Sequence, residues 1–207
     1  MPFIQVRIHK SDEPEKYISG INKTLDILGR TNAAISRSIL NPKIFIAFTR
    51  YESFEEQQKQ YNENIKTDMS LIGSFQQIRT GFFVRENTND KDGKILKNSN
   101  YAVINSMTVK MGHIDKVRAL GSLHFEKYGK DNASKGIGMW QHRQIIGEPM
   151  NRLIYVTSYP DMKSAEDFLT QDFSKRDQQI ANELSIFSDN IDAFNARGLF
   201  EIIRHQS

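Results

Sequence analysis

Two short stretches in the second half of this 207-residue chain decide the expected fold. The first is NSMTVKMG, residues 105–112, and the second is RLIYVTSY, residues 152–159. Each combines apolar, β-branched or aromatic residues and precedes a helical pattern, as a strand that leads into a helix does. In residues 152–159 both alternating sets of side chains are apolar or aromatic, which predicts a strand covered on both faces.

The residues around these stretches alternate between strand and helix patterns. In the second half, strands are expected at 101–110, 139–146, 152–159 and 197–205, and helices at 113–128 and from 162 onward. In the first half, strands are expected at 3–9, 33–40, 43–51 and 79–86, and helices from 11 to 29 and from 53 onward. Both halves have the order βαββαβ, which is the ferredoxin-like pattern.

Short motifs also repeat between the halves. Thr49 and Tyr51 recur as Thr157 and Tyr159, each pair ending a predicted strand just before a helix. The tripeptide GFF, starting at Gly81, recurs as GLF near the C-terminus, with an insertion before the second copy. Repeats of this length indicate a duplicated domain.

The duplication predicts two domains joined by a short segment. Residues 1–88 form the first half and residues 101–207 the second, with a linker or exposed loop at 89–100, which is rich in Asn, Asp and Lys. Because helices cover one face of each sheet, the other face also needs cover. We therefore expect an α+β protein in which the two sheets pack on each other as a barrel-like pair.

Composition narrows the function classes. With 38% hydrophobic and 26% charged residues, the chain suits a soluble globular protein, and no apolar run approaches the roughly 20 residues of a membrane span. The N-terminus lacks the pattern of a secretory signal, so we expect a cytoplasmic protein without a membrane partner. The net charge is +3, with Lys and Arg scattered among Asp and Glu, which argues against a nucleic-acid partner.

The sequence contains no pattern typical of a metal site or of a reactive thiol. The chain has no cysteine, which excludes disulfides, thiolate nucleophiles and cysteine-based metal sites. No two of the five histidines have the spacing of a helical metal pair. We expect no metal site from these patterns.

The tandem order and the residues 105–112 resemble the dimeric α/β-barrel superfamily. That superfamily includes antibiotic-biosynthesis-type monooxygenases, haem-degrading monooxygenases, NIPSNAP-like proteins and chlorite-dismutase-like proteins. The resemblance implies two tandem ferredoxin-like βαββαβ halves that pack as an intramolecular dimeric α/β barrel. Asn105 falls where the antibiotic-monooxygenase group has an Asn that helps hold substrate or oxygen. Tyr159 falls where the haem-degrading branch has a Trp, whereas Asp177 or Gln178 falls where that branch has its haem-ligating His.

Two groups of residues are candidates for chemistry. Asn105, Tyr155 and Tyr159 are the catalytic candidates, since their side chains can polarise a phenol or quinol and stabilise developing charge. The substrate-binding candidates are Trp140, His142, Arg143 and His124. A row of Trp140, His142 and Gln144 beside the tyrosines would suit an aromatic ligand, with Arg143 neutralising an anion. Packing alone explains the same residues: aromatic side chains fill sheet cores, and a His on an apolar helical face is commonly a core residue.

The sequence therefore predicts a small-molecule-binding protein. The leading hypothesis is a cofactor-independent monooxygenase that acts on an aromatic substrate in the second half. The alternatives are a non-enzymatic binding or stress-related barrel protein, and a haem-binding protein that uses His124. Self-association is left open.

Overall fold

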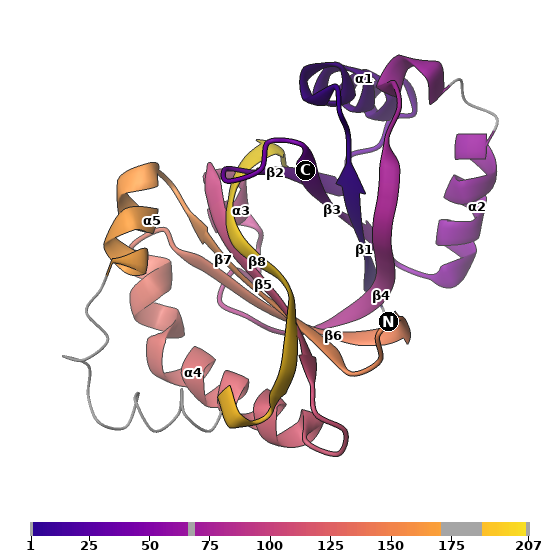
Figure 1. Ribbon diagram of the computed structural model, residues 1–207. Coiled ribbons are helices and arrows are strands. Elements are labelled where there is room, and N and C mark those ends of the chain that lie inside the picture. Colours follow the sequence, from indigo (N-terminus) through magenta and orange to yellow (C-terminus); the bar gives the residue numbers. More distant parts are fainter. Residues whose placement is uncertain (1, 66–68, 171–187, 206–207) are drawn as a thin grey trace. The chain divides into compact units, whose positions relative to one another are not determined.

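The computed structural model describes residues 2–65, 69–170 and 188–205 (Figure 1). Over these residues the fold is α+β. The first elements are β1 (Phe3–Lys10), α1 (Pro14–Ile27), β2 (Ala33–Ser38), β3 (Ile44–Tyr51), α2 (Phe54–Ile65), η1 (Met69–Ile72) and β4 (Gln76–Thr88). The later elements are α3 (Lys94–Lys97), β5 (Tyr101–Val109), α4 (Ile114–Ser134), β6 (Gly138–Gly147), β7 (Arg152–Tyr159), α5 (Met162–Leu169) and β8 (Ile191–Arg204).

The strands are hydrogen-bonded to one another in a closed antiparallel barrel. Their order around the barrel is β1-β3-β2-β8-β5-β7-β6-β4, and β4 pairs with β1. The chain divides into two compact units. The first unit contains residues 1–84, 145–148 and 200–207, and the second contains residues 85–144 and 149–199.

In the first unit, α1 and α2 pack on the same face of β1 and β3. Phe45 of β3 contacts Tyr17 of α1, and Phe3 of β1 stacks on Phe54 of α2 with ring centroids 4.3 Å apart. The register places Phe3 opposite Tyr51 and His9 opposite Phe45. Odd-numbered residues of β1 therefore face these helices, and Ile4, with the other even-numbered residues, faces the other side of the sheet.

In the second unit, α4 and α5 pack on one face of β5 and β7 (Figure 1). Met107 and Leu153 pack with Val117 of α4, while Val103 and Tyr159 pack with Ala165 of α5. Leu153 and Ile154 point to opposite faces of β7, and both are buried. The expectation of a strand covered on both faces is therefore confirmed.

Several element ends differ from the expectation. β4 and β8 are longer than expected, and α4 continues to Ser134, beyond the expected end at residue 128. The order of strands and helices matches the expectation. The sequence insertion expected before the last strand lies partly outside the described residues.

The segment expected to be an exposed loop is partly buried. Asp90 is 2% exposed, and its carboxylate accepts hydrogen bonds from the backbone N–H groups of Ile95 and Leu96 at the short helix α3. Ser99 is fully buried, with its hydroxyl 2.7 Å from that of Ser158. Residues 89–100 are thus fastened to the second unit.

Within the described ranges, no helix has both the length and the apolar character that crossing a membrane requires.

Candidate functional site

Strand register brings three polar side chains to one face of the sheet in the second unit. Asn105 on β5 lies directly opposite Tyr155 on β7, which in turn lies opposite Gln141 on β6. Directly opposed residues share a face, so all three point toward α4 and α5. Arg143 is two residues beyond Gln141 and shares this side of the sheet.

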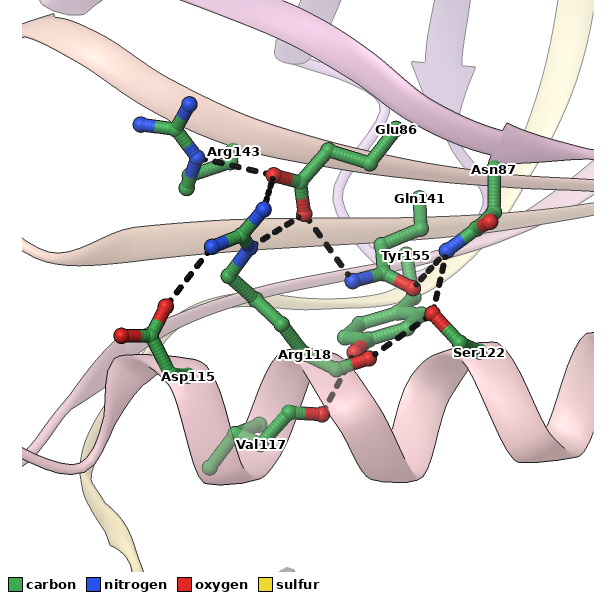
Figure 2. A network of polar contacts seen from close by, with 9 residues as sticks. All are labelled: Glu86, Asn87, Asp115, Val117, Arg118, Ser122, Gln141, Arg143 and Tyr155. Carbon is green, nitrogen blue, oxygen red and sulfur yellow. Dashed lines mark hydrogen bonds and ion pairs between the residues drawn. The ribbon is translucent and has the colours of Figure 1, made fainter.

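Glu86 is the centre of a charged network on this face (Figure 2). Arg118 of α4 binds its carboxylate with two nitrogens, Nη2 at 2.6 Å from Oε1 and Nε at 2.9 Å from Oε2. Arg143 donates from Nε to Oε1 at 2.8 Å, and Gln141 donates from Nε2 to Oε2 at 3.2 Å. The hydrogen bond that Arg118 donates to Glu86 is the main cause that raises the pKa of Arg118, with Asp115 contributing further.

The outer part of the Arg143 guanidinium is turned away from this network. Figure 2 shows both terminal nitrogens directed away from Glu86, while Nε makes the contact. The Arg143 side chain is 35% exposed. It can therefore offer two more donors to an anionic group without losing Glu86.

A second set of hydrogen bonds orients the Gln141 amide. Asn87 donates from Nδ2 to Gln141 Oε1 and to Ser122 Oγ, each at 3.0 Å. Gln141 thus accepts from Asn87 and donates to Glu86, which fixes the direction of its amide. The Ser122 hydroxyl donates back to the Arg118 carbonyl at 3.2 Å.

Tyr155 brings a phenol to the contact between α4 and the sheet. Its hydroxyl donates to the Val117 carbonyl at 3.5 Å. Burial is the main cause that raises the pKa of Tyr155, and the Glu86 charge adds to it while Arg118 opposes it. The hydroxyl is therefore a neutral donor at pH 7.

Gly121 allows α4 to approach the sheet this closely. A Cβ at Gly121 would lie 2.4 Å from Gln141 Oε1 and 2.5 Å from Tyr155 Oη. Both distances are too short for any real side chain, so only glycine fits between these two groups.

Asn105 carries a buried acceptor. Its Oδ1 is buried, and none of the residues that the structure describes donates a hydrogen bond to it. Along β5, Asn105 lies between Met107, which packs toward α4, and Val103, which packs toward α5. A buried carbonyl without a donor costs about 1–3 kcal/mol, so this acceptor is a plausible contact for a hydroxyl from a bound molecule.

Tyr159 is on β7, the strand of Tyr155, and His124 is on α4, the helix of Gly121. Tyr159 is fully buried, and its ring centroid lies 5.6 Å from that of Phe168 on α5. His124 is half-buried on α4, with its ring centroid 4.7 Å from that of Tyr128.

The use of His124 as a haem ligand stays a prediction. One turn before it, at Gly121, the helix backbone meets Gln141 and Tyr155. Of the residues that the structure describes, no three His, Asp or Glu side chains form a group that could hold a metal ion. Asp177 and Gln178, which align with the haem ligand of the haem-degrading branch, lie outside the described residues.

Trp140 and His142 lie on the opposite face of the sheet from Tyr155 and Tyr159. Trp140 pairs with Val156 and His142 with Ile154, whereas the tyrosines alternate to the helix side. The expected row beside the tyrosines is therefore wrong. Both side chains are buried, and burial, together with the charge of Arg85, lowers the pKa of His142 to about 3.

Sequence reasoning missed Glu86, Arg118, Gln141 and Asn87 as a connected group. Glu86 and Asn87 are adjacent, but Arg118 and Gln141 lie far from them in the chain, and the four share no motif. The one signal available was alternation along residues 139–146, which places Gln141 and Arg143 on the face opposite Trp140 and His142.

This chain is similar to known proteins in structure but matches none of them by sequence. No family model matches the chain, and no curated protein matches it. A solved structure of an anthrone oxidase-like protein has 13% identity and a TM-score of 0.70, covering 100% of this chain and 93% of that one. A proposed monooxygenase from Fusobacterium nucleatum has 11% identity and a TM-score of 0.67, with coverage of 100% and 93%.

A variant of chlorite dismutase from Candidatus Nitrospira defluvii has 9% identity and a TM-score of 0.53, covering 97% of this chain and 90% of that one. Identities this low establish the fold and leave the activity open. The resemblance predicted from the sequence is confirmed at the level of the fold: this chain has an α/β-barrel fold similar to that of these solved structures.

Proposed function

We propose that the chain binds a small aromatic molecule on the helix-facing side of the second unit and oxygenates it without a cofactor. The observation that carries the proposal is the buried, unpartnered Oδ1 of Asn105 directly opposite Tyr155. An acceptor and a neutral phenol donor on adjacent strands suit a substrate that carries both a hydroxyl and a carbonyl.

Each residue has a stated role in this proposal. Asn105 accepts a hydrogen bond from a substrate hydroxyl. Tyr155 gives up its 3.5 Å contact with the Val117 carbonyl and donates to the oxygen on which negative charge develops. Arg143 offers its two outward nitrogens to the same charge. Tyr159 and His124 bound the ligand's rings. Trp140 and His142 are not among the proposed contacts, because they lie on the opposite face.

The reaction class is oxidation of an activated aromatic carbon by dioxygen. An anthrone illustrates the balance: loss of a proton from its methylene gives a carbanion stabilised as an enolate, which reduces dioxygen and forms a hydroperoxide at that carbon. Loss of water then gives the quinone, so that one anthrone and one dioxygen yield one anthraquinone and one water. The likeness to an anthrone oxidase-like protein supports an anthrone that carries a ring hydroxyl as the first probe, since it has both groups.

We also propose that the chain is a tandem of two ferredoxin-like halves. The first βαββαβ set has strand order β4-β1-β3-β2, and the second has β8-β5-β7-β6. In each set the two central strands are the first and third, as a ferredoxin-like half requires. β3 and β7 both span eight residues and both end at a tyrosine.

The test is oxygen consumption by the purified protein with the hydroxyl-bearing anthrone in air, together with the absorbance of the quinone. Asn105→Ala and Tyr155→Phe are each expected to lower the initial rate by about tenfold or more, the loss typical for one removed hydrogen-bonding group. Tyr61→Phe is the matched control, because Tyr61 is an exposed residue of α2 in the first unit, and its rate should equal that of the unmodified protein.

Other outcomes of this experiment would favour a different function or a different site. Saturable binding of the hydroxyl-bearing anthrone without oxygen uptake would replace the enzyme by a non-enzymatic binding protein. Rates that are unchanged in both Asn105→Ala and Tyr155→Phe would place any oxidation elsewhere in the molecule.

A further inference from the structure

Arg7, in the first unit, has no carboxylate partner among the described residues. It lies on β1, opposite Ala47 on one side and Thr80 on the other, on the face that meets α1 and α2. Its Nη2 donates to the Thr49 hydroxyl at 2.7 Å, while its Nε is buried without a hydrogen-bond partner. Among the residues with described positions, no carboxylate lies within ion-pairing distance of Arg7.

Other arginines of the same unit behave differently. Arg30 pairs with Glu63, Arg37 pairs with Glu15 and Glu201, and Arg204 pairs with Asp26. Taking a guanidinium out of water without a counter-charge is costly. The fold thus carries at Arg7 a cost that it avoids at Arg30, Arg37 and Arg204.

The groups around Arg7 are neutral at pH 7. Burial is the main cause that lowers the pKa of His9 to about 4, and the Arg7 charge lowers it further. Burial raises the pKa of Tyr17 to about 12, with Arg7 opposing that rise, and the pKa of Tyr51 moves in the same direction for the same reasons. The charge of Arg7 therefore reaches three side chains, none of which neutralises it.

Aromatic rings line the same face beside this cation. Phe3 stacks on Phe54 at 4.3 Å, and Phe82 lies with its ring 5.5 Å from Phe3. Tyr51 also lies 5.5 Å from Phe3 and donates from its hydroxyl to Gln5 Oε1 at 3.4 Å. Cation, hydroxyls and rings thus occur together on one side of one sheet.

We propose that the first unit binds a small aromatic carboxylate through Arg7. The carboxylate receives the free Nε–H and an adjacent Nη–H as a two-pronged contact, which is the geometry that guanidinium offers to carboxylate. The ring of the ligand packs against the aromatic cluster of Phe3, Tyr51 and Phe82. This site lies in the first unit and does not depend on the oxygenation proposed for the second.

Benzoate is the probe, and the Nε–Hε signals of arginine in the ¹⁵N-labelled full chain are the readout. We expect a saturable shift of the Arg7 signal with benzoate. Benzamide has the same ring without the charge, and acetate has the charge without the ring. Each is expected to bind at least about tenfold more weakly than benzoate. Arg7→Gln should lose the benzoate affinity by about tenfold or more, measured by calorimetry.

Arg37→Gln is the matched control, because it removes the same charge from the same unit at a residue that already has two carboxylate partners. It should bind benzoate as the unmodified protein does. If Arg7→Gln does not fold, Arg7→Lys replaces it, since lysine keeps the charge and loses the fork. Absence of a saturable shift, equal binding of benzamide, or undiminished binding by a folded Arg7 variant would each overturn the proposal. Equal binding of acetate would overturn the aromatic part of it.

Discussion

Arg118 holds the Glu86 carboxylate with both Nε and Nη2, at 2.9 and 2.6 Å from its two oxygens. A two-pronged contact of this kind fixes direction as well as distance. Arg143 adds a third donor at 2.8 Å to a carboxylate whose side chain is 10% exposed. One acidic residue therefore ties α4 to strands β4 and β6.

Replacing that acid should weaken the second unit. Glu86→Gln keeps the size of the side chain but removes the buried carboxylate between the guanidinium groups of Arg118 and Arg143, and leaves Arg118 with the exposed Asp115. We expect the free energy of unfolding to fall by roughly 2–3 kcal/mol, measured by urea denaturation at pH 7 with circular dichroism.

Asp115→Asn is the control for this experiment. Asp115 also pairs with Arg118, at 2.7 Å, but its side chain is 85% exposed, so its loss should cost less than about 1 kcal/mol. Equal losses in the two variants would contradict a special role for the buried acid.

The order of elements was predictable because it depends on local patterns. The strand that ends at Tyr51 and the strand that ends at Tyr159 both begin and end close to where alternation and turn residues placed them. The longer β4 and β8 were not predictable, since their extra residues are stabilised by neighbouring strands that a local pattern does not reveal.

The candidate site was predictable only in part. Alternation correctly separated Gln141 and Arg143 from Trp140, yet it cannot say which side of a strand meets the helices. Register with β7 decides that, and it placed Trp140 away from the tyrosines. The Glu86 network depends on contacts between distant parts of the chain, which no motif encodes.

The close approach at Gly121 gives a second prediction. Gly121→Ala would place a Cβ 2.4 Å from Gln141 Oε1 and 2.5 Å from Tyr155 Oη, so either α4 or both side chains must move. We expect a loss of about 1–3 kcal/mol in unfolding free energy, as for other overpacked sites. Thermal denaturation and urea titration both measure it.

Gly129→Ala on the same helix is the matched control. Its Cβ would meet Asn89 Cβ at 3.5 Å, an ordinary contact, so the better helix propensity of alanine should stabilise the protein by up to about 1 kcal/mol. Opposite signs for the two variants are the expected result. The same sign for both would indicate that helix propensity, rather than the approach to Tyr155, controls the outcome.

The buried carboxylate of Asp90 gives a third prediction. It accepts backbone hydrogen bonds from Ile95 at 3.1 Å and Leu96 at 2.9 Å. Asp90→Ala leaves both donors without this partner, and we expect roughly 2 kcal/mol less stability in urea denaturation. Asp92→Ala removes an acid that is 57% exposed and pairs with Lys94, so it should cost far less stability than Asp90→Ala. If Asp92→Ala were the more damaging change, the anchoring role of Asp90 would be wrong.

Acidification should destabilise the protein partly through His9. Its folded pKa is lowered to about 4 from 6.5, mainly by burial and then by the Arg7 charge. Between these two values the unfolded chain binds more protons than the folded one, so the free energy of unfolding falls as pH drops from about 6.5 toward 4. We expect roughly 1–2 kcal/mol of loss from His9 between pH 7 and pH 5.

His9→Gln should make this pH dependence shallower, because glutamine does not titrate. Urea denaturation of both proteins at pH 7, 6 and 5 measures the difference. His142, whose pKa is lowered to about 3, titrates in the same window, so the variant should keep part of the acid sensitivity and lose the rest only when His142→Gln is added. Parallel pH profiles for the unmodified protein and His9→Gln would mean that His9 accepts a proton in the folded state as readily as in the unfolded chain.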